Sequence, residues 1–296
     1  MIKKLINKLF QIEIWSICFC KCNVNNFINS KGNKLKDHKT INNSLWSYFA
    51  DPFIVSVTKN HAELLVEEYH FLKGGQISFL RVNLNNLTYK KKIILKSKHF
   101  SYPFFFKSLK KLIIFPEMSA ENKNLFYYFN NSKIKEGINY FKKFNLIDPT
   151  IYKKNNLNYL FTSRHGFSEN KKLLVYYSKN LHGPWNLIKK IGFKRNKSNS
   201  RSAGKIFKLN RVYYRPSQDC SKTYGHKLNI SKIIKISKNE YNEKLIFKIN
   251  PKNIDKYSDG IHHIDFQNNL VLFDKKRYKY SFFKLLYKFS RMANHV

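Results

Sequence analysis

Charged and hydrogen-bonding side chains recur at the ends of short apolar hairpins along the chain, and these are the residues that could do chemistry. The set consists of Asp51, Glu67, Glu68, Glu117, Asp148, Arg164, Arg215, Gln218, Asp219, His262 and His263. Carboxyl groups held close together raise one another's pKa, while a nearby arginine lowers it by about 1–3 units, so such a group could share general acid and base roles. The alternative is that each Asp-Pro pair only starts a turn, because aspartate caps local backbone N–H groups.

The positions of these side chains follow an internal repeat. Its copies begin at residues 51, 102, 148, 203 and 261, so the steps are 51, 46, 55 and 58 residues. Each copy has two apolar runs joined by a polar turn, such as Thr58–His61 or Lys153–Asn156. A repeat of this length, rich in short strands, is typical of a propeller blade. The sequence therefore predicts an all-β fold, a five-bladed β-propeller.

This architecture also predicts a common site. The residues before the first strand of each blade and those after its second strand face the same end of the propeller axis, so their side chains should converge on one pocket. The fourth copy carries the most unusual segment, Arg215–Gly225, in which a strand runs into charged and amide groups and then a Tyr224-Gly225 turn. Packing alone does not require such a segment, and we assign Tyr224 to the site.

The two ends of the chain flank the predicted propeller, which spans residues 12–280. Residues 12–19 alternate in polarity and predict a strand that closes the ring by joining the last blade. Residues 23–45 predict a loop. Residues 1–11 form a basic amphipathic segment too short and interrupted for a signal peptide or membrane span. Residues 281–296 predict a basic amphipathic helix that packs on the propeller or lies on an anionic membrane surface.

Composition narrows the class of protein. The chain has 56 lysines and arginines against 18 aspartates and glutamates, a formal net charge of +38, which suits nucleic acid or anionic lipid. The lysines are scattered, however, and no nucleic-acid-binding motif accompanies them, so the sequence does not favour nucleic acid as the partner. The four cysteines include no C-x-x-C pair, so we interpret them as reduced thiols of a cytoplasmic protein, and a zinc site is the alternative. Because the tails are basic and amphipathic, the protein is expected at the periphery of a membrane.

A set of motifs in a fixed order resembles a known family. They are Ala50-Asp51-Pro52-Phe53, Glu67-Glu68, Ser101-Tyr102-Pro103-Phe104, Pro116-Glu117, Asp148-Pro149-Thr150, Arg215-Pro216-Ser217-Gln218-Asp219-Cys220 with Tyr224-Gly225, and Asp259-Gly260-Ile261-His262. Together they resemble the N-terminal domain of plant glucosamine inositolphosphorylceramide transferases and its bacterial relatives. That domain is similar to the five-bladed propellers of family-43 and family-32 glycosidases.

The resemblance implies roles for individual residues. Asp51 matches the aspartate that acts as base or nucleophile, Asp148 matches the one that orients and tunes, and Glu117 is our choice for the acid, with Asp219 and Glu68 behind it. The remaining site residues are assigned to substrate binding: Glu67, Glu68, Arg164, Arg215, Gln218, Asp219, Tyr224 and His262. No cofactor is expected, apart from a central ion near His262 or His263. Blade four departs from the glycosidase pattern, because Arg215 and Asp219 stand where an acid glutamate is expected.

Three functions follow. The first is a carbohydrate-active protein acting on a cell-surface glycan or glycolipid, because glycoside cleavage needs one proton-donating carboxyl group and one carboxylate with separated pKa values. The second is a non-catalytic glycan-binding module that assists a glycosyltransferase, which the missing glutamate of blade four favours. The third is a protein held to a membrane or nucleic acid by charge alone.

Overall fold

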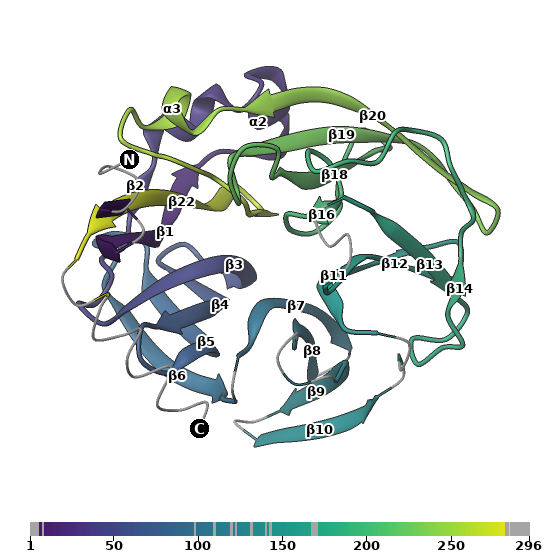
Figure 1. Ribbon diagram of the computed structural model, residues 1–296, viewed down its shortest axis with the longest axis horizontal. Coiled ribbons are helices and arrows are strands. Elements are labelled where there is room, and N and C mark those ends of the chain that lie inside the picture. Colours follow the sequence, from purple (N-terminus) through teal and green to yellow (C-terminus); the bar gives the residue numbers. More distant parts are fainter. Residues whose placement is uncertain are drawn as a thin grey trace.

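Five sheets, antiparallel except for one edge strand of blade four, surround a common axis, and the predicted five-bladed β-propeller is confirmed (Figure 1). The structure, a computed structural model, describes residues 6, 7, 9–97, 99–108, 111–118, 121, 123–130, 133–139, 141, 144–166, 171–281 and 284. The predicted basic tails, residues 1–11 and 281–296, therefore lie largely outside the described residues. Within those residues no helix is long and apolar enough to cross a membrane.

The blades follow one another along the chain. Blade one contains β3 (Ser47–Val57), β4 (His61–His70), β5 (Gly74–Asn83) and β6 (Tyr89–Leu95). Blade two contains β7 (Ser101–Ser108), β8 (Lys111–Glu117), β9 (Leu125–Asn130) and β10 (Lys133–Asn139). Blade three contains β11 (Leu146–Lys154), β12 (Leu157–Arg164), β13 (Leu174–Ser178) and β14 (Asn186–Leu187). The strands β3, β7 and β11 lie innermost (Figure 1).

Blade four is the largest sheet. It contains β16 (Arg201–Ser202), β17 (Phe207–Leu209), β18 (Val212–Asp219), β19 (Lys227–Ile236), β20 (Glu240–Ile249) and the parallel edge strand β15 (Lys190–Ile191). Blade five contains β21 (Ile264–Gln267), β22 (Leu270–Tyr280), β1 (Gln11–Lys21) and β2 (Lys39–Thr40).

Blade five joins the two ends of the chain, as the alternating pattern of residues 12–19 predicts. β1 pairs with β22 over its whole length, from Gln11 opposite Tyr280 to Lys21 opposite Leu270. The prediction of a plain loop over 23–45 was wrong. That segment forms the helix α2 (Val24–Asn29), the 3-10 helix η1 (Asn33–Asp37) and β2, because the Asn23 side chain caps α2 and Phe27 is fully buried. A further short helix, α3 (Pro251–Ile254), follows β20.

The residue before the proline in three copies has an unusual backbone conformation. Asp51, Tyr102 and Asp148 have φ angles of +47°, +44° and +46°, and the strand register shifts at each of them. Left-handed backbone is disfavoured for residues other than glycine, and aspartate tolerates it better than most. In the fourth copy Gly204 has φ +121°. The repeat motif thus marks a bulge at the inner end of the first strand in blades one, two and three.

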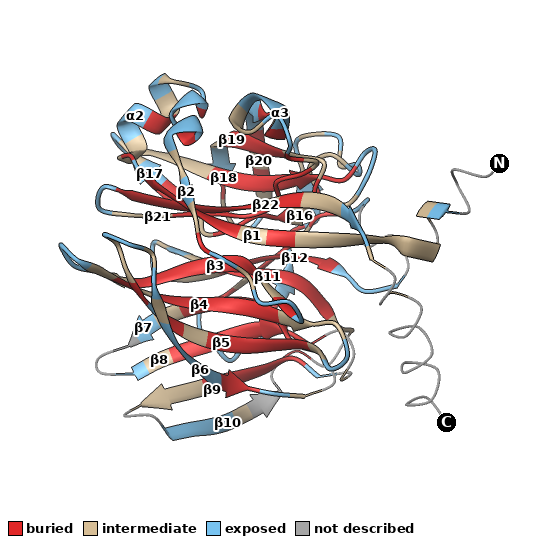
Figure 2. Cartoon of the chain, turned by 90° about the vertical axis from the view of Figure 1, so that its left-hand side faces the viewer, coloured by how far each residue is buried: buried red, intermediate tan, exposed pale blue. Residues whose placement is uncertain are grey.

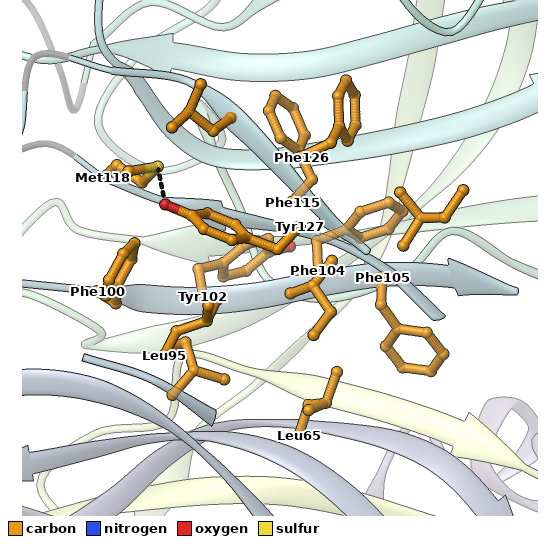
Figure 3. Packing of buried hydrophobic residues seen from close by; sticks show 14 of the residues in the cluster. Leu65, Leu95, Phe100, Tyr102, Phe104, Phe105, Phe115, Met118, Phe126 and Tyr127 are labelled. Carbon is orange, nitrogen blue, oxygen red and sulfur yellow. Dashed lines mark hydrogen bonds between the residues drawn. The ribbon is translucent and has the colours of Figure 1, made fainter. Parts of the chain in front are cut away.

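Aromatic side chains fill the space between blades. Phe53 of blade one meets Tyr102 of blade two edge-to-face with ring centroids 5.1 Å apart, and within blade two Phe115 stacks on Phe126 at 4.3 Å. Figure 3 shows this cluster, with the hydroxyl of Tyr127 donating to Sδ of Met118 at 3.9 Å. Aromatic pairs of this kind contribute about 0.5–1.5 kcal/mol each beyond their buried area. In Figure 2 the buried residues run along the middle of the strands.

Candidate functional site

A pocket of about 230 Å³ lies where four blades meet at one end of the axis. It is lined by Trp15, Tyr48, Ala50, Glu67, Tyr69, His99, Ser101, Glu117, Arg201, Tyr224 and His262. We call it the axial pocket. Four of the residues assigned to the site from sequence line it: Glu67, Glu117, Tyr224 and His262. The other seven lining residues were not assigned from sequence.

Cross-strand pairing explains how blades one and two present side chains to the axial pocket. Residues directly opposite each other on antiparallel strands point to the same face of the sheet. Ala50 lies opposite Glu67 in blade one, and Ser101 lies opposite Glu117 in blade two. All four line the pocket. Glu67 and Glu117 are therefore equivalent residues of neighbouring blades.

The same alternation turns Glu68 away from the axial pocket. Its carboxylate accepts hydrogen bonds from the Ser78 hydroxyl at 2.7 Å and the Gln76 amide at 3.1 Å, and it pairs with Lys91. Burial would raise the pKa of Glu68, but these donors outweigh it and lower the pKa. Glu68 thus binds within its own blade, and the expectation that it faces the pocket was wrong.

In blade four, too, adjacent polar side chains point in opposite directions, one toward the axis and one away from it. The Gln218 amide points inward and donates to Asp148 at 3.0 Å. Asp219, the next residue, pairs outward with Lys248 at 3.0 Å. Arg215, on the same face as Asp219, donates to both carboxylate oxygens of Glu243 at 2.7 Å. Because side chains alternate along a strand, Arg215 and Asp219 cannot accompany Gln218 to the axis.

Arg164 lies outside the axial pocket as well. Its side chain is exposed and its guanidinium lies 5.3 Å from the ring centroid of Phe144. The expectation that an arginine lies near the central acids does not hold for Arg164 or Arg215, because neither contacts those acids in the described part of the chain.

Arg201 is the arginine that lies close to the central acids. Its Nε and Nη2 donate to the two oxygens of Asp148 at 2.6 and 3.1 Å, and Nη2 lies 3.7 Å from Glu117. Its guanidinium is 5.0 Å from the ring centroid of Tyr224. Burial would lower the pKa of Arg201, but the attraction of Asp148 outweighs it and raises the pKa. In the sequence Arg201 is marked only by its place two residues before the fourth copy, and its position opposite Gln218 is seen only in the folded sheet.

Backbone N–H groups at the bulges bind carboxylates of the preceding blade. The Asp51 N–H donates to Asp274 at 3.1 Å, the Tyr102 N–H to Asp51 at 3.2 Å, and the Asp148 N–H to Glu117 at 3.0 Å. Asp51 and Asp148 are 3% and 2% exposed and do not line the axial pocket. These two carboxylates therefore connect blades beneath the pocket floor.

The two acids that do line the axial pocket favour the protonated form. Burial, with repulsion from Asp148, raises the pKa of Glu117 to about 8. Burial, with repulsion from Asp51, raises the pKa of Glu67 well above its usual range. No residue in the described part of the chain hydrogen-bonds the Glu67 carboxyl group. The Glu67 carboxyl group thus lines the pocket with its hydrogen-bonding capacity unused by the described residues.

Aromatic rings form the walls of the axial pocket. The Trp15 and His262 rings lie 3.8 Å apart between centroids, Tyr224 meets Trp15 edge-on at 6.0 Å, and Tyr48 stacks on Tyr69 at 5.2 Å. The fully buried Lys276 supports this wall, because its ammonium group donates to the Tyr224 carbonyl at 2.5 Å and lies 5.4 Å from the Trp15 ring.

The region expected to hold a central ion lies beside these walls. One ligand atom each from Asp51, His262 and Asp274 falls within 4.8 Å of the others, and all three residues are buried. Oδ1 of Asp51 has no hydrogen-bond partner among the described residues and is 3.5 Å from Nε2 of His262. Two carboxylates and an imidazole form a donor set that fits a divalent cation. His263 packs its ring 4.4 Å from Phe53, and burial lowers its pKa to about 3.

The sequence from residue 36 to residue 271 matches the family described as "Glucosamine inositolphosphorylceramide transferase 1, N-terminal". The chain belongs to this family. The match covers most of the propeller, from η1 in blade five through the first residues of β22. The resemblance carried by the sequence motifs is confirmed.

Two curated relatives carry that family's name. The chain is 34% identical over 153 residues to glucosamine inositolphosphorylceramide transferase 1 of Oryza sativa subsp. japonica, which spans 49% of this chain and 20% of that protein. It is 31% identical over 180 residues to the Arabidopsis thaliana protein of the same name, 56% of this chain and 23% of that protein. The match thus covers less than a quarter of each relative.

Solved propeller structures share the fold. A GH43 beta-xylosidase/alpha-arabinofuranosidase from a compost microbial metagenome superimposes with a TM-score of 0.54 at 10% identity, covering 79% of this chain and 91% of that chain. The GH32 beta-fructofuranosidase of Bombyx mori superimposes with a TM-score of 0.51 at 12% identity, covering 77% of this chain and 55% of that chain. At this identity the likeness concerns the fold alone.

Proposed function

We propose that the axial pocket binds one sugar unit of a glycan or glycolipid and that the chain acts as a sugar-binding module for a glycosyltransferase. The observation that carries the proposal is the lining itself: aromatic walls of Trp15, Tyr48, Tyr69 and Tyr224 around the polar groups of Glu67, Glu117 and Arg201. A sugar ring has an apolar C–H face that packs against aromatic rings and hydroxyl groups that need hydrogen bonds. The family's name, which includes glucosamine and a glycolipid, agrees with this ligand class.

The size and charge of the axial pocket narrow the ligand further. At about 230 Å³ it is smaller than the 300–1,000 Å³ typical of drug-sized ligands, so a single ring suits it better than an oligosaccharide. Glu67 and Glu117 would meet the ammonium group of an amino sugar as carboxylates, since a cation close by lowers a carboxyl pKa. A neutral sugar would instead accept hydrogen bonds from their protonated forms. An amino sugar is therefore the preferred ligand.

Glycoside cleavage is the second candidate, and one feature favours it. Within the described ranges Glu67 pairs with no arginine, and its raised pKa suits a proton donor. Cleavage also needs an ionised carboxylate near the reacting carbon. Asp51 and Asp148 lie beneath the floor, with Asp148 held by Arg201. The catalytic roles expected of Asp51, Asp148 and Glu117 stay predictions, and binding is the better-supported function.

Calorimetric titration with millimolar methyl glucosaminide and methyl glucoside tests the proposal. We expect saturable binding that prefers the amino sugar, loss of binding in Trp15→Ala, and roughly tenfold weaker binding in Glu67→Gln, equivalent to about 1.4 kcal/mol. Trp46→Ala is the control, because Trp46 is 47% exposed and does not line the pocket. A folded chain that binds neither sugar would contradict the proposal. If the chain released nitrophenol from nitrophenyl glycosides and Glu67→Gln abolished the release, glycoside cleavage would become the better-supported function.

Three expectations stay predictions. A divalent cation between Asp51, His262 and Asp274 would be checked by elemental analysis of the purified chain, and the same analysis reports any zinc. The cytoplasmic location at a membrane periphery would be checked by fractionation of cells. A charge-only binder of membrane or nucleic acid requires steep loss of binding with salt.

A further inference from the structure

A second and larger pocket, of about 580 Å³, lies between blades five and one. Its apolar lining consists of Phe19, Val57, Leu84, Leu87 and Leu270. Three lysines also line it: Lys21, Lys39 and Lys59. We call it the distal pocket, because it occupies the far ends of strands whose other ends reach the axial pocket.

The distance between the two pockets follows from strand geometry. Along β3, Tyr48 lines the axial pocket and Val57 the distal one, nine residues further. At about 3.3 Å per residue this separates them by about 30 Å. Along β1, Trp15 and Lys21 lie six residues apart, or about 20 Å. The distal pocket is therefore a separate site and does not depend on the proposed sugar binding.

The apolar floor of the distal pocket is an open edge of a hydrophobic cluster. Phe19 and Leu270 belong to the buried cluster between blades five and one, while Val57, Leu84 and Leu87 pack against it and stay partly exposed. Exposed apolar surface gathered in a concave site of this volume is typical of small-molecule binding. The ligand must therefore bring an apolar portion.

The charges at the distal pocket determine the sign of the ligand. Lys21, Lys39 and Lys59 are exposed, and none forms an ion pair with a carboxylate in the described part of the chain. Asp37 is the single acidic residue that lines the pocket. Three ammonium groups against one carboxylate attract an anion at short range. An inorganic anion would leave the apolar floor exposed, and a neutral oil would leave the lysines unused.

We infer that the distal pocket binds a single-chain anionic lipid. The hydrocarbon chain packs against Phe19, Leu84 and Leu87, and the anionic group lies among Lys21, Lys39 and Lys59. Such a ligand complements both the apolar floor and the lysines of the distal pocket. Substitutions can remove the apolar contacts and the charge contacts separately.

Calorimetric titration of the full chain with dodecanoate, below its micelle concentration, tests the inference. We expect one saturable site, and much weaker binding of dodecyltrimethylammonium and of inorganic phosphate. Leu87→Asn removes part of the apolar floor; Leu87 has φ +58°, a conformation that asparagine accepts readily, so the substitution adds no backbone strain. We expect at least tenfold weaker dodecanoate binding in this variant.

The lysines are tested by a matched pair of triple variants. Lys21→Gln/Lys39→Gln/Lys59→Gln should weaken dodecanoate binding about tenfold and reduce its preference over the cationic amphiphile. Lys135→Gln/Lys153→Gln/Lys244→Gln removes the same charge from exposed sites of blades two, three and four and should leave binding unchanged. Equal weakening in both triple variants, no saturable dodecanoate binding, or binding only to vesicles of anionic lipid would overturn the inference. The triple variants keep the test decisive if Leu87→Asn does not fold.

Discussion

Arg201 links two acidic groups of different blades at the axial pocket, so its loss should be felt in stability. Arg201→Gln leaves Asp148 buried without its bidentate partner. Removing one member of a buried ion pair typically costs about 3–5 kcal/mol. We expect a loss of that order in the free energy of unfolding, measured by urea denaturation. Arg81→Gln, at an exposed site of blade one, is the control and should cost less than about 0.5 kcal/mol.

Glu117 should make stability depend on pH in a way that glutamine abolishes. Burial raises its pKa in the folded chain from 4.5 to about 8. The folded state therefore holds a proton that the unfolded state releases, so this contribution is fully present below pH 4.5 and is lost as pH rises toward 8. Glutamine mimics the protonated acid at every pH.

The measurement is thermal unfolding of the chain and of Glu117→Gln between pH 5 and 8.5. We expect the stability of the variant relative to the unsubstituted chain to increase with pH, by on the order of 4 kcal/mol across this range. A difference that stays constant, or that shrinks with pH, would show that Glu117 is ionised in the folded chain.

At the scale of the element, the bulges that begin the first three blades require unusual backbone at Asp51, Tyr102 and Asp148. In the fourth copy Gly204 occupies this place with φ +121°, and a Cβ there would lie 1.9 Å from the Ile264 carbonyl oxygen. Gly204→Ala should destabilise the fold by at least about 3 kcal/mol, because clash and backbone strain add. Gly166→Ala is the control that measures backbone strain without a clash. Gly166 has φ +82°, and a Cβ there would meet no atom of the described residues within 4 Å.

Chemical denaturation of both glycine variants measures the difference. The control should lose about 1–2 kcal/mol from its left-handed backbone alone. Equal losses in the two variants would mean that the close approach of blades four and five at Gly204 can relax.

Strand periodicity also explains how far the sequence predicts the site. The repeat places Glu67, Glu117, Tyr224 and His262 at one end of the axis, and all four line the axial pocket. It does not say which of two adjacent polar residues turns inward. That choice depends on the register of the bulge, which sends Glu67 inward and Glu68 outward.

At the scale of the whole molecule, ring closure brings together residues that the repeat does not connect. Trp15 comes from the strand that closes blade five, and Arg201 lies in the two-residue strand β16 of blade four. Their sequence neighbourhoods contain no motif, so only the closed ring shows that both reach the axial pocket. The blade count and the closing strand were predictable because repeats and alternation are local patterns. Contacts across the axis are not local, and that part was missed.

A crystal structure of the chain with methyl glucosaminide is the most direct test of the sugar-binding pocket. We predict one sugar ring in the axial pocket, with a C–H face against Trp15 or Tyr224 and its ammonium group near Glu67. Sugar bound elsewhere, or an axial pocket that stays free of sugar at saturating concentration, would contradict the proposal.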